Sequence, residues 1–188
     1  MRNEKGNCLV VIENGKLTTY LLDNKISWAV GRSSKENMPD INLHSLTVSR
    51  QHGFLRNIDG IWFYVDGMGK NGTVYNGKHI KPGLRGNVKP ITMNHGDILI
   101  FGGGEEPIIN SKTIWAMFLE RTFDENWRVE DTKGYISLSF TCGNQTTVYE
   151  KPAKGMVIEK ENGIAIYMGN ITYLIGDMEV KGDKKETS

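Results

Sequence analysis

The fold is constrained most by a succession of short segments rich in β-branched and aromatic residues, each closed by Gly, Asn, Asp or Pro. Such segments are typical of β-strands, and the closing residues favour tight turns. No segment has the periodicity of a long amphipathic helix. The pattern predicts an all-β sandwich of short strands, whose end loops carry function on a rigid frame. Strands are expected at residues 8–12, 17–22, 26–30, 53–58, 61–66, 97–101 and 113–120.

A polar stretch with little strand pattern follows, and strand-like segments then resume at 135–141, 147–150, 156–160, 163–168 and 171–175. This order predicts a sandwich domain at 1–121, a linker at 122–133, a small β-rich extension at 134–180 and a disordered tail at 181–188. The extension is small for an independent core, so we expect it to pack on the first domain or on a partner.

Composition excludes several classes of function. Hydrophobic residues make up 38% of the chain and charged residues 24%, and the formal net charge is +1, so we expect no nucleic-acid partner. No apolar run is long enough for a membrane helix and the first residues do not resemble a signal peptide, so we expect a cytoplasmic protein without a membrane partner. Cys8 and Cys142 are too few for a disulfide framework or a zinc site, and we expect neither metal nor cofactor.

Ser49 and His52 raise the question of a hydrolase pair, because nucleophilic catalysis needs a base within reach of the hydroxyl. The surrounding sequence does not favour catalysis. No G-x-S-x-G turn occurs, and the histidines have no metal-ligand spacing. We therefore expect no catalytic residue and no enzyme activity, and we interpret His52 as a buried hydrogen-bonding strut.

The same region fits an anion site better. A phosphate monoester is bound by a guanidinium, a hydroxyl and turn amides, because charge-assisted hydrogen bonds are the stronger ones. Arg32 ends one predicted strand, Ser49 and Arg50 precede another, and Lys70 and Asn71 lie in a turn between two more. Loops at one end of a sandwich would bring these residues together.

Five sequence blocks strengthen this interpretation: "VGRSS" at 30–34, "DINL" at 40–43, "VSRQHG" at 48–53, "NGTVYNG" at 71–77 and "HGDILIFGG" at 95–103. In this order, over residues 7–121, the chain resembles the forkhead-associated (FHA) domains, which bind phosphothreonine peptides. The resemblance implies an FHA-type β-sandwich of antiparallel and mixed strands. It also implies a binding module whose partner is a threonine-phosphorylated protein, downstream of a Ser/Thr kinase.

The resemblance assigns roles to individual residues. The residues expected to contact the phosphopeptide are Arg32, Ser49, Arg50, Lys70 and Asn71. The residues expected to shape the loops are Gly31, His52, Gly72, Thr73, Asn76 and Gly77. Two positions depart from the family pattern. Gly69 stands where a serine is common, which predicts the loss of one loop hydrogen bond, and Gly53 replaces a small apolar residue, which predicts only a small cost in strand propensity.

Two other functions fit the same sequence. One is a phosphate-independent structural or assembly protein that uses the sandwich faces or the C-terminal strands. The other assigns function to the C-terminal strands, which would bind a partner by adding an edge strand.

Overall fold

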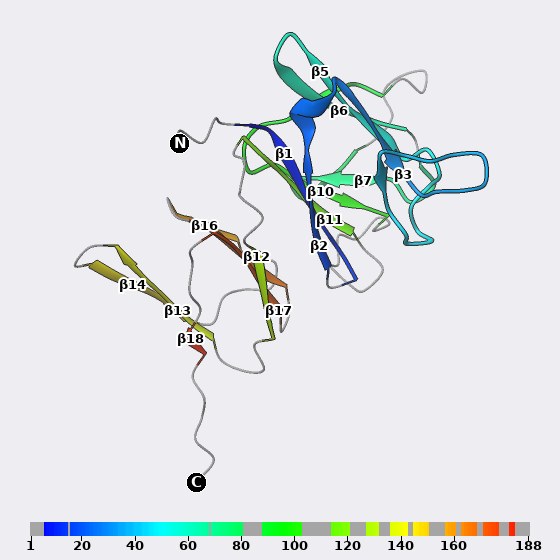
Figure 1. Ribbon diagram of the computed structural model, residues 1–188. Coiled ribbons are helices and arrows are strands. Elements are labelled where there is room, and N and C mark those ends of the chain that lie inside the picture. Colours follow the sequence, from blue (N-terminus) through cyan, green and yellow to red (C-terminus); the bar gives the residue numbers. More distant parts are fainter. Residues whose placement is uncertain are drawn as a thin grey trace. The chain divides into compact units, whose positions relative to one another are not determined.

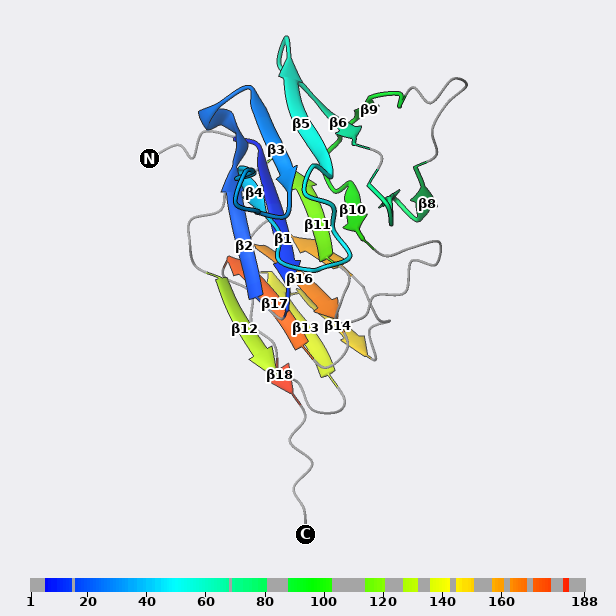
Figure 2. The same cartoon turned by 90° about the vertical axis from the view of Figure 1, so that its right-hand side faces the viewer.

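The computed structural model describes residues 6–14, 16–67, 69–80, 88–102, 114–120, 127–131, 136–142, 145–150, 157–160, 163–168, 171–176 and 181–182 (Figures 1 and 2). The chain divides into two compact units, Met1–Thr122 and Phe123–Ser188. Among the described residues the regular structure is β-strand throughout, apart from a short 3₁₀ turn η1 at Leu22–Asn24, which confirms the all-β prediction. No helix in these ranges is long and apolar enough to cross a membrane.

The first unit contains a six-stranded sheet in the order β2-β1-β11-β10-β7-β8. All neighbouring strands in it are antiparallel. Its strands are β1 (Cys8–Glu13), β2 (Lys16–Leu21), β7 (Thr73–Tyr75), β8 (Lys78–His79), β10 (Ile98–Phe101) and β11 (Ile114–Leu119).

The second sheet of this unit has five strands in the order β4-β3-β5-β6-β9. Strands β3 and β4 are parallel and the other pairs are antiparallel, so the mixed pairing expected of an FHA-type sandwich is present. Its strands are β3 (Ser27–Gly31), β4 (Ile41–Asn42), β5 (Gly53–Ile58), β6 (Ile61–Asp66) and β9 (Ile91–Thr92).

The core lies between the two sheets. Alternate residues of each strand point inward, as the two-residue period of a strand requires. Leu9 and Phe101 come from the six-stranded sheet and Leu55 and Tyr64 from the five-stranded sheet, and all four are fully buried in one cluster. The side chains of both sheets therefore form one sandwich core.

The direction of the strands determines where the candidate site residues lie. Strand β3 ends at Gly31, β5 begins at Gly53, β6 ends at Asp66 and β7 begins at Thr73. The loops 32–40 and 43–52 and the turn 69–72 therefore lie at the same end of the sandwich. The β5–β6 hairpin lies at the opposite end, and Figure 2 shows it projecting from the sheet.

The second unit consists of a four-stranded sheet, β12-β17-β16-β15, and a three-stranded sheet, β14-β13-β18. Its strands are β12 (Trp127–Asp131), β13 (Ile136–Cys142), β14 (Gln145–Glu150), β15 (Val157–Lys160), β16 (Gly163–Met168), β17 (Ile171–Gly176) and β18 (Lys181–Gly182). The β-rich character expected of the extension is thus present in its described residues.

Two sequence interpretations were wrong in this unit. Trp127–Asp131, expected in a linker, is strand β12 paired with β17, because its apolar and charged residues alternate with the period of a strand. Lys181–Gly182, expected in a disordered tail, is strand β18 and pairs with Ile136–Ser137, since backbone pairing needs no apolar side chain. The remaining parts of the predicted linker and tail, 122–126, 132–133 and 183–188, lie outside the described residues.

Candidate functional site

The loops that follow β3 and precede β5 are joined through their backbones. The Arg32 N–H donates to the Ser49 carbonyl at 3.1 Å, and the His52 N–H donates to the Val30 carbonyl at 2.9 Å. Gly31 allows this approach, because a Cβ at that position would lie 2.1 Å from the Arg50 carbonyl oxygen. Figure 1 shows these loops together at one end of the sandwich, in light blue and cyan.

Arg32, Arg50 and Lys70 make this end of the molecule cationic. Arg50 and Lys70 are exposed, and the half-buried Arg32 directs its Nε toward the Val48 carbonyl at 3.2 Å. Among the described residues, the ion pairs are Lys25 with Asp40 and His44 with Glu13, so no carboxylate neutralises these three cations. A site with this charge favours an anionic ligand.

Ser49 connects this loop to the turn that follows β6. Its Oγ accepts a hydrogen bond from the backbone N–H of Lys70 at 3.2 Å. Because this bond uses the oxygen as an acceptor, the hydroxyl hydrogen remains available to donate to a ligand. Asn71 lies beside it and donates from Nδ2 to the Thr47 carbonyl at 2.8 Å, which fixes the orientation of its amide. The structure thus brings Arg32, Ser49, Lys70 and Asn71 together, with Arg50 next to Ser49 in the chain.

His52 joins the two loops from the buried side of the site. Its Nδ1 accepts from the backbone N–H of Ser49 at 3.2 Å, so its Nε2 carries the hydrogen and donates to the Gly72 carbonyl at 3.1 Å and to Thr73 Oγ1 at 3.0 Å. Burial lowers the pKa of His52, although the Asp66 charge and the bond to Gly72 act in the opposite direction. His52 contacts the backbone of Ser49 and not its hydroxyl, so the two residues do not form a nucleophile and base.

Thr73 extends this network into the core. Its hydroxyl donates to Asp66 Oδ1 at 2.7 Å, and the Tyr64 hydroxyl donates to the same oxygen at 3.2 Å. Burial, together with the Asp66 charge, raises the pKa of Tyr64 well above its usual value. The buried carboxylate therefore accepts two hydrogen bonds through Oδ1, which offset part of the cost of burying its charge.

Tyr64 also explains the glycine at position 53. A Cβ at Gly53 would lie 2.4 Å from the Tyr64 hydroxyl and 2.8 Å from its ring. The prediction that Gly53 affects little beyond strand propensity was therefore wrong, since this glycine makes room for a tyrosine of the buried network.

Gly69 has a similar role at the surface. A Cβ there would lie 2.9 Å from both Ser49 Oγ and His52 Nδ1. The absence of a side chain lets the segment lie close to Ser49, where the Lys70 N–H makes its bond. A glycine at this position cannot make the side-chain hydrogen bond that a serine would make. The Lys70 N–H instead bonds to Ser49 Oγ and joins the two loops directly.

The turn itself requires glycine at position 72, which has φ +63°. His79 of β8 lies against it, because a Cβ at Gly72 would lie 2.5 Å from the His79 Cε1 atom. This contact could not be predicted from sequence, since a two-residue strand leaves no periodic signal.

Asn76 and Gly77 lie in the β7–β8 turn, where Asn76 contacts Asp97 and Ile98. Asn76 donates from Nδ2 to Asp97 Oδ1 at 2.8 Å and accepts from the Ile98 N–H at 2.8 Å, while Gly77 completes the turn with φ +79°. These residues shape the β7–β8 turn, and β8 in turn carries the His79 that covers Gly72.

The loop after β3 is held by residues that the sequence did not single out. The Ser33 N–H donates to Asn42 Oδ1 at 2.9 Å, and Asn37 donates from Nδ2 to the Arg50 carbonyl at 2.8 Å. Their only sequence signal is the amide side chain, which commonly bonds nearby backbone groups in loops.

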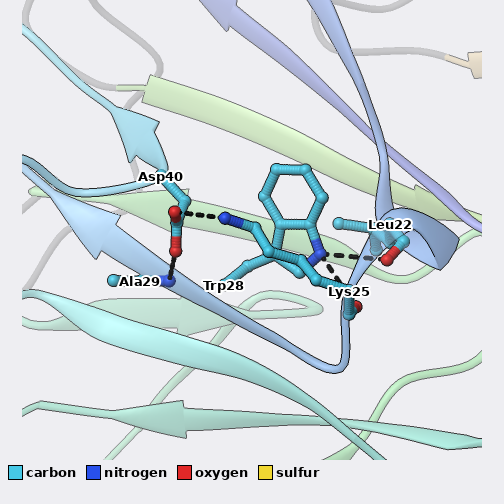
Figure 3. Close-up of polar contacts among 5 residues, drawn as sticks. All are labelled: Leu22, Lys25, Trp28, Ala29 and Asp40. Carbon is cyan, nitrogen blue, oxygen red and sulfur yellow. Dashed lines mark hydrogen bonds and ion pairs between the residues drawn. The ribbon is translucent and has the colours of Figure 1, made fainter.

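The far end of that loop is fixed by Asp40 (Figure 3). Its carboxylate accepts from the Ala29 N–H at 2.8 Å and forms an ion pair with Lys25, whose ammonium lies 4.5 Å from the centre of the Trp28 ring. The Trp28 indole N–H donates to the Leu22 carbonyl at 3.0 Å. Burial acts to raise the pKa of Asp40, but the hydrogen bonds from Lys25 and Ala29 outweigh it and lower the pKa.

Comparison with known proteins places this geometry in a family. The model of the FHA domain matches residues 28–102. No curated protein matches the chain in sequence. Among solved structures, full-length Pml1p from yeast is 22% identical with a TM-score of 0.50, over 63% of this chain and 83% of that chain. The FHA domain of CT664 from Chlamydia trachomatis is 18% identical with a TM-score of 0.46, over 62% of this chain and 99% of that one.

The family match spans the loops that carry Arg32, Ser49, Lys70 and Asn71, and the likeness to Pml1p supports the sandwich fold. FHA domains are interaction modules that bind phosphopeptides. Residues 28–102, which carry these loops, therefore match the FHA domain, the family that the sequence motifs resemble.

Proposed function

We propose that this chain recognises threonine-phosphorylated partner proteins in the cytoplasm, downstream of a Ser/Thr kinase, and that it is not an enzyme. One observation carries this function. Three cations without a described carboxylate partner, Arg32, Arg50 and Lys70, lie on the loops that contact Ser49, whose hydroxyl is free to donate. This arrangement suits a phosphate dianion, which an unmodified threonine cannot imitate.

In this mechanism the phosphate binds to groups that are already in place. The Arg32 guanidinium faces the phosphate, and the Ser49 hydroxyl donates to one of its oxygens. Arg50 and Lys70 add charge at the exposed side of the site. Asn71 keeps its Nδ2 on Thr47, so its Oδ1 can accept an N–H from the peptide backbone. Because His52 fixes both loops before the ligand arrives, little conformational entropy is lost on binding.

We assign binding to the unit Met1–Thr122, which carries all five of these residues. Full-length protein should retain threonine-phosphorylated proteins from an extract, and phosphatase treatment of the extract should abolish retention. The variants Arg32→Ala and Ser49→Ala should lose the same proteins while remaining folded. Equal retention with and without phosphatase would instead favour a phosphate-independent assembly protein.

Matched controls are available in the same domain. Arg56 and Ser27 are exposed and lie toward the opposite end of the five-stranded sheet, where Ser27 pairs with Arg56. The variants Arg56→Ala and Ser27→Ala remove the same side chains away from the site, and they should bind phosphorylated partners as the parent protein does.

A further inference from the structure

Two apolar side chains are exposed on the loops that form the site. Among the described large hydrophobic residues, Leu46 is the most exposed, at 84%, and Met38 follows at 79%. Met38 belongs to the loop that begins with Arg32, and Leu46 to the loop that carries Ser49. Single exposed hydrophobic residues are common on protein surfaces. These two differ because both neighbour the same cationic site.

Met38 is held in position on both sides. Asn37, before it, donates to the Arg50 carbonyl at 2.8 Å and pairs with Ser34 through its backbone. Asp40, two residues after it, is bonded to the Ala29 N–H and to Lys25 (Figure 3). The loop therefore presents Met38 from a fixed backbone, and its neighbour Asn37 contacts the Arg50 carbonyl.

Leu46 is held in the same way. It lies in a turn in which the Val48 N–H donates to the Ser45 carbonyl at 3.1 Å. The Ser45 N–H is itself bonded to the carboxylate of Glu13 at 2.9 Å. The next residue, Thr47, accepts the hydrogen bond from Asn71. Leu46 is thus presented beside the asparagine that we expect to bind the peptide backbone.

We infer that Met38 and Leu46 are apolar contact points of the binding site, and that its ligand is a phosphothreonine peptide with large aliphatic or aromatic residues near the phosphothreonine. This inference rests on the proposed function. When a ligand side chain covers apolar surface on a loop that is already ordered, the burial contributes binding free energy. No conformational entropy is then lost in ordering the loop. Methionine also adapts to differently shaped partners, so the contact at Met38 accepts several apolar residues.

Charge on the same loop does not favour another ligand class. Lys35 and Glu36 are both exposed beside Met38 and carry opposite charges. These two charges offset each other, so Met38 and Leu46 supply the apolar part of a site whose remaining charge, from Arg32, Arg50 and Lys70, serves the phosphate.

The test is an affinity selection on the full-length protein with a peptide library that has a fixed phosphothreonine and randomised neighbours. The variants are Met38→Glu and Leu46→Glu. The control is Ile26→Glu, since Ile26 is 75% exposed and bonds through its carbonyl to Asn57 of β5, away from the site. Peptides selected by the parent protein are then titrated against all four proteins by fluorescence anisotropy.

We expect Leu, Ile, Met, Val or Phe to be enriched at one or more positions near the phosphothreonine. Met38→Glu and Leu46→Glu should each weaken binding of the selected peptides by about ten-fold or more, and Ile26→Glu should leave it unchanged. Phosphate-dependent selection without apolar enrichment, or unchanged affinity in both variants, would overturn this inference alone. Failure to retain any phosphopeptide in preference to its unphosphorylated form would overturn the proposed function as well.

Discussion

The backbone N–H of Lys70 donates a hydrogen bond to Ser49 Oγ across 3.2 Å, and so joins two loops separated by a strand hairpin. This bond orients the serine before any ligand is present. The hydroxyl oxygen is occupied as an acceptor, so its hydrogen remains available for donation to a ligand. The contact between the two loops thus also positions the hydroxyl that we expect to bind the ligand.

Substitution of Gly69 should weaken binding through this bond. In Gly69→Ala, the added Cβ would lie 2.9 Å from Ser49 Oγ, so either the hydroxyl or the turn must move. We expect about a five- to ten-fold loss of phosphopeptide affinity, measured by calorimetry. Ser27→Ala is the control, because Ser27 is exposed in β3 and pairs with Arg56 away from the site. Equal affinity of Gly69→Ala and the parent protein would contradict a role for the Lys70–Ser49 bond.

Substitution of Gly53 should destabilise the domain. A methyl group 2.4 Å from the Tyr64 hydroxyl overpacks the core, and we expect a loss of about 1–3 kcal/mol in the free energy of unfolding. Urea denaturation of Gly53→Ala, Tyr64→Phe and the double variant measures the coupling. Removal of the hydroxyl should relieve part of the clash, so the double variant should be more stable than the sum of the single effects predicts. Strict additivity would show that the two residues do not interact.

Stability should decrease as the pH falls below 6.5, the ordinary pKa of a histidine. His52 takes up a proton at lower pH in the folded protein than in the unfolded chain, because burial disfavours its charged form. Acid therefore favours the unfolded state. Urea unfolding between about pH 7.5 and about pH 5.5 should show this loss, and nuclear magnetic resonance should show a His52 pKa below 6.5. A His52 pKa at or above that value would contradict the buried strut.

The Lys25–Asp40 pair should contribute little to stability by itself. The two side chains are 43% and 32% exposed, so solvent screens their attraction. We expect Lys25→Met to lower the free energy of unfolding by less than about 1 kcal/mol, and high salt to reduce that difference. Asp40→Ala should cost more, because it also leaves the Ala29 N–H without its acceptor. Equal effects of the two substitutions would contradict this division of roles.

The long strands could be predicted from the sequence, whereas the short ones could not. Gly53–Ile58 and Ile61–Asp66 have the predicted bounds because they contain enough residues for β-propensity and turn signals to act together. Ile91–Thr92 and Lys78–His79 have two residues each, so their pairing depends on neighbouring strands and not on their own pattern. Trp127–Asp131 lies within a longer polar stretch, which predicts a linker because the alternation covers only these few residues.

The candidate site was likewise predictable only in part. Motif order indicated Arg32, Ser49 and Asn71, because each has a side chain suited to phosphate or peptide. The contacts that hold the loops could not be predicted in this way. The bond from Asn37 to the Arg50 carbonyl and the fit of Gly53 to Tyr64 depend on distances between segments, which a single sequence does not contain.

The central claim is that Arg32 makes binding depend on phosphate. The most direct test is the affinity of a selected threonine peptide, with and without its phosphate, for the parent protein, Arg32→Ala and Arg56→Ala. We expect the parent protein and Arg56→Ala to bind the phosphorylated form alone, and Arg32→Ala to lose about a hundred-fold in affinity while its thermal unfolding stays cooperative. Equal binding of both peptide forms by the parent protein, or full affinity in folded Arg32→Ala, would contradict the claim.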